Sequence, residues 1–481
     1  MRGIVWLRRD LRLLDNPALS EACRVCHEVI PLFVFDKPLL ASREFGSAIV
    51  NFMLGCLQEL SDDLAAQGVS LRWRYGEPCE EVTAATRDWN ADIVYWNRDY
   101  EPGAVERDRR VQQRLANMGV STRTFKDHVV FEAEEVRSAT GEALQRYSAY
   151  RTRWWVKWHA VKPQGLPAPT LPREAAATNG PARLALPSAE DFGYEKMTPC
   201  IEPGEQASHK RLRLFVEGPI HGYTDGRNRP AIDGTSGLSP HFRFGTLSPR
   251  TAIHAALASL SRGGRVSPSD VFTWIDELVW REFFQQVLAA FPRVAAGPFR
   301  NAVVPPSREP GPQRDRLFEA WCAGKTGFPI VDAGMRQLNR TGWMHNRVRM
   351  IVASFLIKDL RIDWRSGERY FMHYLIDADV AANNGNWQWC ASTGTDAMRG
   401  YRIFSPVLQS KKFDPNGEYI RRYVPELAEV PLLRIHEPHL MTEEEQDQAR
   451  CRIGRDYPLP IVNHQQARKE YLDLGKAAKR A

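Results

Sequence analysis

The first 130 residues alternate short apolar runs with longer segments of helical periodicity, and this alternation constrains the fold more than any other feature of the chain. The segment 46–67 is one of the helical stretches. The apolar runs are rich in β-branched and aromatic residues, as strands buried on both faces of a sheet are. This spacing predicts an α/β fold with a parallel, doubly wound sheet. The expected strands are Ile4–Leu7, Val29–Phe35, Val69–Tyr75, Ile93–Asn97 and Val120–Phe125.

Proline marks the end of this first region. Residues 161–205 contain eight of the 32 prolines, and apolar periodicity is lost there. Such a stretch is typical of a connector between domains. From about residue 206 the periodicity is helical, so we expect an all-α second domain. The expected helices include 269–291, 314–323, 330–339 and 342–359, and the predicted organisation is 1–135 (α/β), 136–205 (connector) and 206–481 (helical).

Charge is distributed unevenly along the chain. Residues 1–135 carry 17 Lys and Arg against 22 Asp and Glu, whereas the remainder carries 48 against 36. The basic excess is compatible with a phosphate-bearing partner, but charge alone favours the alternative of a solvated surface rich in arginine. No apolar run approaches the roughly 20 residues of a membrane-spanning helix. Eight scattered cysteines indicate reduced thiols, and we expect a cytoplasmic protein.

The segment DVFTWIDELVWREFFQQVL places aromatic and charged side chains on one helical face. Trp274, Glu277 and Arg281 share that face by i, i+3 and i+4 spacing, and Trp280 lies at its edge. A carboxylate buried between two indoles needs a hydrogen-bond donor. The alternative is a surface Glu277–Arg281 pair above packed tryptophans.

A second segment, TGWMHNRVRMIVASFLIKDL, combines an indole, an amide, guanidinium groups and a thioether. Trp343, Asn346 and Met350 fall on one face of a helix, and Arg347 flanks it. These groups suit a planar heteroaromatic ligand that bears carbonyls and phosphates. An amphipathic helix with basic residues on its solvated side is the alternative.

The segment LIDADVAANNGNWQWCASTGTD is the densest in polar groups. Asp377 and Asp379 precede an asparagine cluster, and two tryptophans follow. The composition is poor for a helix or a strand, so we expect turns that present polar side chains to a cavity. Two aspartates without histidine are a weak transition-metal site. Upstream, the hydroxyls and backbone amides of residues 235–239 suit a phosphate.

Together these segments resemble the DNA photolyase/cryptochrome family, and most closely its class I cyclobutane pyrimidine dimer photolyases. The resemblance runs from VWLRRDLRLLDNPAL to FDPNGEYIRRYVPEL, nearly the whole chain. It also includes GTSGLSPHFRFGTLSPR, ELVWREFF and LIDADVAANNGNWQWCASTGTDA. Ordered motifs of this length are highly specific. The resemblance implies an antenna-binding α/β domain followed by an all-α domain that binds FAD, which is active in its reduced form.

The function implied by the resemblance is that of a deoxyribodipyrimidine photo-lyase. Excited reduced FAD would give an electron to a flipped-out pyrimidine dimer in UV-damaged DNA, and the electron would return after the ring opens. A monomer that associates with the nucleoid on damage is expected. The alternative is a cryptochrome-type blue-light photoreceptor. Asn383 favours repair, because a neutral amide can hydrogen-bond the reduced flavin anion, whereas plant cryptochromes carry Asp at this place.

The resemblance also implies residue roles. Glu277 and Asn346 would hydrogen-bond the pyrimidine carbonyls, and Glu277 would have to be protonated to donate. Trp280 and Trp389 would sandwich the dimer. Met350 would pack against the dimer. DNA contacts are implied for Glu277, Trp280, Arg281, Asn346 and Arg347, and FAD contacts for Tyr223, Thr235, Ser236, Gly237, Leu238, Ser239, Trp274, Asp377, Ala378, Asp379 and Asn383.

Two further expectations concern electron transfer to FAD and the harvesting of light. Trp387 and Trp364 match the inner members of a family relay of three tryptophans, but PFRNAVVPPSREP, where the outermost normally lies, contains none. Light-driven reduction of oxidised FAD is therefore expected to be slow or rerouted through another aromatic residue. An antenna chromophore is also implied, either a folate (5,10-methenyltetrahydrofolate) or 8-hydroxy-deazaflavin. Glu101 matches the antenna-pocket segment, and its alternative is a surface carboxylate after a strand.

Overall fold

Five strands build one parallel sheet in the first part of the chain. The computed structural model describes residues 1–172, 185–261, 267–300, 305–397 and 402–478. Within these residues the strand order is β3-β2-β1-β4-β5, and each neighbouring pair is parallel. The predicted doubly wound sheet is therefore confirmed. The strands are β1 (Arg2–Leu7), β2 (Glu28–Asp36), β3 (Arg72–Gly76), β4 (Ile93–Asn97) and β5 (Ser121–Phe125).

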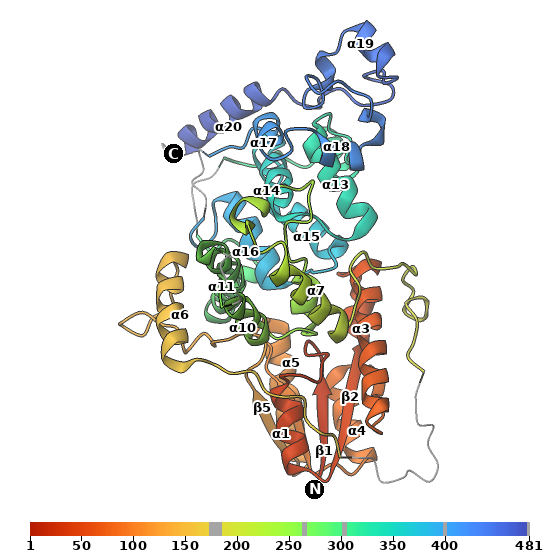
Figure 1. Cartoon of the computed structure of the whole chain (residues 1–481), viewed down its shortest axis with the longest axis vertical. Helices are drawn as coiled ribbons and strands as arrows, with labels where there is room; N and C mark the ends of the chain where they lie inside the picture. The colour runs from red at the N-terminus through yellow and green to blue at the C-terminus, as the bar shows by residue number, and fades with distance from the viewer. Residues whose placement is uncertain (173–184, 262–266, 301–304, 398–401, 479–481) are drawn as a thin grey trace. The chain divides into compact units, whose positions relative to one another are not determined.

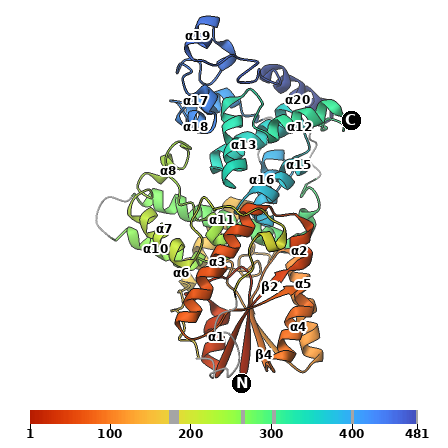
Figure 2. The same cartoon turned by 90° about the vertical axis from the view of Figure 1, so that its right-hand side faces the viewer.

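Helices cover both faces of this sheet. In Figure 2, α1 and α3 lie on one face and α4 and α5 on the other. Trp6 and Trp96 of the strands pack in a buried core with Val82 of α4 and Leu115 of α5. Burial on both faces explains why β1, β2 and β4 are continuous apolar runs instead of alternating ones. The bounds are α1 (Pro17–Val25), α2 (Lys37–Ser42), α3 (Ser47–Ala66), α4 (Pro78–Asp88) and α5 (Pro102–Asn117).

The chain divides into two units, and many of their elements are labelled in Figure 1. The first unit comprises Met1–His221, Ser236–Ala295 and Ile376–Ala382, and the second comprises Gly222–Thr235, Ala296–Leu375 and Asn383–Ala481. Besides the sheet and its helices, the first unit contains α6 (Tyr147–Val161), η1 (Glu190–Phe192), α7 (Glu205–Glu217), α9 (Ser239–Phe244), α10 (Pro249–Ser259), α11 (Pro268–Ala290) and η2 (Pro292–Ala295). The domain limits read from the sequence stay a prediction.

The second unit is helical, as expected. In the part of the chain that the structure describes, no helix combines the length and apolarity needed to cross a bilayer. Helix α16 (Val380–Ala391) begins in the first unit and ends in the second. The other elements are α8 (Tyr223–Gly226), α12 (Pro312–Cys322), α13 (Pro329–Thr341), α14 (Asn346–Ser354), the π-turn η3 (Phe355–Asp359), α15 (Trp364–Tyr374), α17 (Pro406–Phe413), α18 (Glu418–Tyr423), η4 (Pro425–Leu427), η5 (Pro438–Leu440), α19 (Glu443–Gln448) and α20 (His464–Ala478).

The expectation of turns at the asparagine-rich segment is wrong, because α16 forms there. Asp379 caps the helix, since its carboxylate accepts from the backbone N–H of Ala382 at 2.9 Å. The side chains of Asn383 and Asn384 donate to Glu368 of α15 instead of to their own backbone. Asparagine disfavours helices mainly by competing for local backbone groups, and this competition is removed here.

The expected helix 342–359 begins later than its periodicity indicates. Helix α14 starts at Asn346 because His345 is its N-cap, with Nδ1 accepting from the N–H of Arg347 at 3.2 Å. Trp343 therefore precedes the helix and does not share a helical face with Met350. Of the tryptophan-free stretch 298–310, residues 301–304 lie outside the described residues.

Candidate functional site

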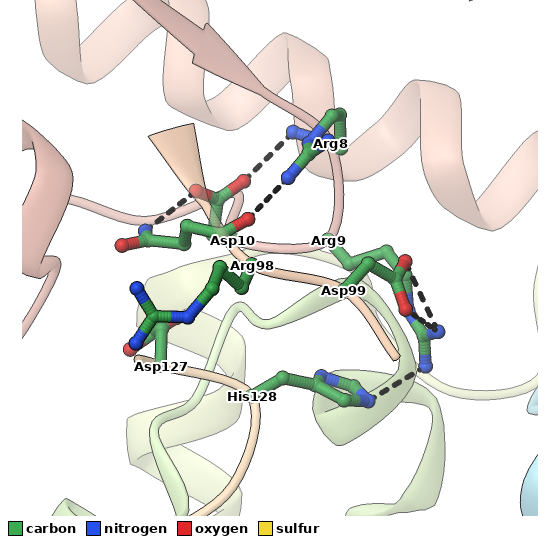
Figure 3. Close-up of a pocket in the computed structure, with 8 residues that line it drawn as sticks. Arg8, Arg9, Asp10, Arg98, Asp99, Asp127 and His128 are labelled. Atoms are coloured by element: carbon green, nitrogen blue, oxygen red, sulfur yellow. Dashed lines mark hydrogen bonds and ion pairs between the residues drawn. The ribbon is translucent and has the colours of Figure 1, made fainter. Parts of the chain in front are cut away.

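A pocket lies at the carboxyl ends of β1 and β4, the two strands between which the strand order reverses direction. Ligands of doubly wound sheets bind at such places. Figure 3 shows the charged lining of this pocket. Arg9 Nη1 lies 3.2 Å from Asp99 Oδ1, and Arg9 Nη2 lies 2.8 Å from His128 Nε2. The lining residues are Arg8, Arg9, Asp10, Asn97, Arg98, Asp99, Asp127 and His128.

Arg9 joins this pocket to Asp379, one of the residues expected near a cofactor. Its Nη2 donates to Asp379 Oδ2, and Gln285 Nε2 donates to the same carboxylate at 3.1 Å. Burial alone would raise the pKa of Asp379, but Arg9 and Arg243 outweigh it and lower that pKa. Asp379 is thus an ionised carboxylate fixed within the first unit.

Glu101 is also part of this network. Its side chain is only 16% exposed, so the alternative of a surface carboxylate is wrong. Glu101 Oε1 accepts from Arg9 Nη1 at 2.7 Å and from Arg243 Nη1 at 3.1 Å. Two guanidinium groups therefore fix the carboxylate beside the pocket. A contact between Glu101 and an antenna chromophore stays a prediction.

Arg281 of α11 points to His128 rather than to the surface. Its Nη2 lies 2.7 Å from His128 Nε2, and its Nη1 donates to the His128 carbonyl at 2.8 Å. Burial lowers the pKa of Arg281 to about 10 and, with nearby guanidinium groups, lowers the pKa of His128 well below 6.5. His128 is therefore neutral at physiological pH. The guanidinium of Arg281 is thus held by His128, which disfavours the alternative of a surface Glu277–Arg281 pair.

The aromatic residues of α11 have different surroundings. Trp274 is 2% exposed and lies 5.1 Å from the ring of Phe215 in α7. Trp280 is half-buried, and Tyr147 stacks on it with centroids 3.5 Å apart and planes within 9°. Tyr147 thus covers one face of Trp280, and a further ring would stack on the other. No sequence motif indicated Tyr147. The aromatic run of 147–158 was its only signal.

Glu282 follows Arg281 and is a second residue that the sequence analysis missed. Its carboxylate accepts from the N–H groups of Val130 and Phe131 at 2.6 and 3.1 Å. Tyr150 Oη and Trp154 Nε1 of α6 donate to it at 3.0 and 2.7 Å. Burial raises the pKa of Glu282 to about 7 against these four donors. Glu282 therefore joins α11 to α6 and to the segment after β5.

In the second unit, the start of α14 carries three of the expected DNA or dimer contacts. Asn346 is exposed, whereas Arg347 and Met350 are half-buried. Arg347 Nη2 donates to Asn228 Oδ1 at 2.6 Å, and Arg347 Nη1 lies 3.7 Å from Met350 Sδ. The guanidinium carbon is 4.4 Å from the ring centroid of Phe413. Arg347 and Met350 are therefore held together, beside the amide of Asn346.

Asn383 provides a test of whether the second unit fits a flavin. The side chain is 9% exposed, and its Nδ2 donates to the Glu368 carbonyl at 2.9 Å. This bond fixes the orientation of the amide. Its Oδ1 accepts no hydrogen bond from the described residues, so it suits an N–H donor such as N5–H of a reduced isoalloxazine. The residue thus fits the group that the sequence implies.

The tryptophans expected in electron transfer lie on α15 and α16. Trp387 is 2% exposed, and a Cβ on Gly367 would approach its ring to 2.1 Å, so only glycine allows α15 to pack here. Trp364 is the first residue of α15 and 7% exposed. Trp389, expected beside the dimer, is half-buried on α16.

The segment expected around phosphates has the required backbone turn. Gly237 has φ +61°, and a Cβ there would lie 2.4 Å from Arg211, whose Nε donates to the Ser236 carbonyl. Ser239 begins α9, and Thr235 ends the segment that belongs to the second unit. Tyr223, Leu238 and Ala378 are buried, and Asp377 is half-buried.

Comparisons with known proteins cover both the sheet and the helical part of the chain. Residues 3–170 match the family "DNA photolyase", and residues 274–477 match "FAD binding domain of DNA photolyase". A deoxyribodipyrimidine photo-lyase of Synechococcus is 40% identical over 99% of this chain and 97% of its own length. A class III photolyase from Agrobacterium tumefaciens has a TM-score of 0.90 at 35% identity, covering 100% of this chain and 98% of that one. A cryptochrome of Synechocystis has a TM-score of 0.88 at 30% identity, covering 98% and 99%.

Proposed function

The chain belongs to the DNA photolyase family, and we propose from this premise that it repairs DNA by splitting cyclobutane pyrimidine dimers in light. One observation carries the proposal: the similarity to curated deoxyribodipyrimidine photo-lyases extends over 99% of the chain, so both the sheet and the helical part are included. The retained alternative is a blue-light photoreceptor, because a cryptochrome has a similar fold at 30% identity.

The cofactor of the proposed reaction is reduced FAD. When bound, it supplies a light-driven electron to the dimer and accepts that electron back after the ring has opened. Asn383 Oδ1 would accept from the flavin N5–H, while its Nδ2 stays bound to Glu368. Trp274 would lie beside the cofactor. The backbone turn at Gly237, with the hydroxyls of residues 235, 236 and 239 and the ring of Tyr223, would hold the phosphates.

Side chains of α11, of α14 and of α16 would each contact the dimer. Glu277 and Asn346 would hydrogen-bond the pyrimidine carbonyls and stabilise the charge that develops there. Trp280 would stack on the dimer with the face that Tyr147 leaves uncovered, and Trp389 would stack on it as well. Met350 would pack against the rings.

Arginines would contact the DNA backbone. Arg347 would bind a phosphate next to the flipped-out dimer, and its bond to Asn228 orients the guanidinium for this contact. A phosphate contact by Arg281 would require the exchange of its bonds to His128. We propose DNA carrying pyrimidine dimers as the partner, and a monomer in the cytoplasm as the active form.

Light harvesting would involve the first unit. A folate or a deazaflavin antenna would bind near Glu101, where the charged pocket lies at the strand ends. The two chromophores have different absorption spectra, so the spectrum of protein purified from its own cells distinguishes them. The helical part from 206 to 481 would then serve as the catalytic domain.

Repair of a UV-irradiated oligothymidylate tests the proposal. The FAD-loaded protein, chemically reduced, is illuminated with blue light, and recovery of the thymine absorbance is followed against a dark control. Recovery only in light is expected. A protein that retains FAD yet restores no absorbance is not a dimer photolyase, and the photoreceptor alternative would then stand.

Glu277→Ala is expected to lower the repair yield much more than the affinity for damaged DNA. The variant removes a hydrogen bond to a carbonyl worth about 1–3 kcal/mol, which matters most when negative charge develops there. The quantum yield of repair and the DNA dissociation constant are measured side by side. Glu106→Ala, at an exposed carboxylate of α5, is the control. An unchanged quantum yield in Glu277→Ala would contradict this role.

A further inference from the structure

Four aromatic rings of the second unit form a continuous series from the interior to the surface. The ring centroid of Trp387 lies 6.3 Å from that of Trp321 on α12. Trp321 lies 5.6 Å from Tyr370 on α15, and Tyr370 stacks on Tyr374 at 4.4 Å with planes 29° apart. Trp387 and Trp321 are 2% and 0% exposed, whereas Tyr374 is 37% exposed. The series therefore ends where solvent begins.

All four side chains are oxidisable, and rings in van der Waals contact exchange electrons rapidly because the rate of transfer falls steeply with distance. Phe371 also touches Trp387, at 5.1 Å, but phenylalanine is too hard to oxidise to take part. It packs against Trp321 as well, at 6.2 Å. Phe371 thus fixes the two indoles relative to each other.

The available proton acceptors decide which of the rings can remain oxidised. An oxidised tyrosine must lose its phenolic proton. Tyr370 Oη donates to Asn339 Oδ1 at 2.7 Å and to the Cys322 carbonyl at 3.1 Å, and neither group is a base. Trp321 Nε1 is likewise bound to a carbonyl, that of Val352. Only Tyr374 is exposed enough to release its proton to water.

The expected route through Trp364 is not joined by ring contacts among the described residues. Among the described residues, the ring contacts of Trp387 are with Trp321 and Phe371. The Arg365 guanidinium carbon lies 5.8 Å from the Trp364 ring centroid, and a cation there disfavours a positive charge on the indole. The outermost tryptophan of the family relay is also missing. Residues 298–310, where it normally lies, contain no tryptophan, and residue 311, just before α12, is glycine.

We propose that Trp387, Trp321, Tyr370 and Tyr374 form an electron relay whose terminal donor is Tyr374. The proposal rests on the proposed function, whose FAD must be reduced, and on the light-driven reduction of oxidised FAD that the family resemblance implies. One electron leaves Trp387 for the FAD and is replaced from Trp321. Trp321 is then reduced by Tyr374 across the ring of Tyr370, which keeps its phenolic proton. Tyr374 loses one electron and its phenolic proton, which passes to water. An external thiol then returns a hydrogen atom to the Tyr374 radical.

Radical trapping tests the relay without measuring repair. Protein loaded with oxidised FAD is illuminated with blue light beside a nitroso spin trap, and adducts are located by mass spectrometry. A light-dependent adduct on Tyr374 is expected. Tyr75, a tyrosine of the first unit that is 43% exposed, is the internal control for diffusing oxidants. Equal adduct yields on Tyr75 and Tyr374 would overturn the proposal.

Three variants separate the two routes. Tyr374→Phe is expected to lose the adduct and the electron paramagnetic resonance signal of a tyrosyl radical, while tryptophanyl radicals persist. Trp321→Phe is expected to lose the Tyr374 adduct, and Trp364→Phe to retain it. Loss of the adduct in Trp364→Phe with its retention in Trp321→Phe overturns the proposal. FAD absorbance shows that each variant is folded, and Tyr374→Phe, at an exposed position, remains informative if Trp321→Phe loses the cofactor.

The outcome of radical trapping is distinguishable from that of the repair assay, because the repair assay uses chemically reduced wild-type protein and so bypasses the relay. Repair without a Tyr374 adduct overturns the relay and leaves the proposed function. An adduct without repair supports the relay and rejects dimer splitting.

Discussion

His345 combines a structural task with a titratable ring that is almost fully buried. Its Nδ1 caps α14, and the side chain is 2% exposed. Burial, aided by Arg347 and Arg349, lowers the pKa of His345 to about 3. Because the unfolded chain keeps the ordinary value of 6.5, it binds more protons between pH 3 and 6.5. The contribution of His345 to stability is therefore complete above pH 6.5 and is lost as the pH falls.

His345→Asn should make the protein less sensitive to acid. Asparagine keeps a capping acceptor but does not titrate. Below pH 6.5 the wild type should lose up to about 1.4 kcal/mol more per pH unit than the variant. Urea unfolding at pH 7.5, 6 and 5 measures this difference. His439→Asn, at an exposed position, controls for the exchange itself. Parallel pH profiles of wild type and His345→Asn would contradict the prediction.

Glu282→Gln should destabilise the first unit by about 1–3 kcal/mol. The carboxylate meets four donors, and an amide replaces one acceptor oxygen with a donor that faces another donor. Urea unfolding at constant pH measures the loss. Glu106→Gln, which changes an exposed carboxylate paired with Arg109, should stay within about 0.5 kcal/mol of wild type. A loss at Glu282 no larger than that at Glu106 would show that the four donors find other partners.

At the scale of elements, the packing of α15 against α16 depends on one glycine. A Cβ at Gly367 would lie 2.1 Å from the Trp387 ring and 2.6 Å from Leu356. Gly367→Ala should therefore cost about 1–3 kcal/mol of stability through overpacking, although alanine is the better helix former. The shift in the urea midpoint measures the cost.

A glycine in another helix of the same unit provides the matched control. At Gly475 in α20 the nearest atom to an added Cβ is 3.4 Å away, an ordinary contact. Gly475→Ala should gain up to about 1 kcal/mol from helix propensity. The two substitutions are chemically identical, so opposite signs separate packing from propensity. If both substitutions stabilised the protein, α15 would have to move away from Trp387 without a cost in free energy.

At the scale of the whole molecule, the net charge of +7 is the sum of an acidic beginning and a basic remainder. DNA binding should weaken with salt, because phosphate contacts release counterions. Arg347→Ala should weaken binding to UV-irradiated duplex and make the slope of log K against log salt shallower by about 1. Fluorescence anisotropy at four salt concentrations measures the slope. Arg109→Ala, in the acidic region, should leave it as in wild type, and an unchanged slope in Arg347→Ala would exclude the phosphate contact.

Apolar periodicity was sufficient to predict the helices and strands whose side chains have a uniform environment. The strands β1, β2 and β4 follow from apolar runs because both of their faces are buried, whereas β3 and β5 are only partly buried. The long helix α11 follows from its repeat. Periodicity failed at α16, where Asp379 and Glu368 satisfy the polar groups that made a helix improbable. It also placed Trp343 on α14, because the cap at His345 is a local contact that apolar spacing does not register.

The amino-acid sequence alone determined the doubly wound sheet, the helical remainder and the family, because these depend on patterns along the chain. The residue roles that the family implies stay predictions. Tertiary structure alone decided that Glu101 is buried between two arginines, that Arg281 binds His128, and that Tyr147 covers Trp280. It also decided that Trp387 is in contact with Trp321. The physical reason is that each of these contacts joins residues far apart in the chain. The energies of the contacts depend on burial and orientation, which the spacing of residues along the sequence does not specify.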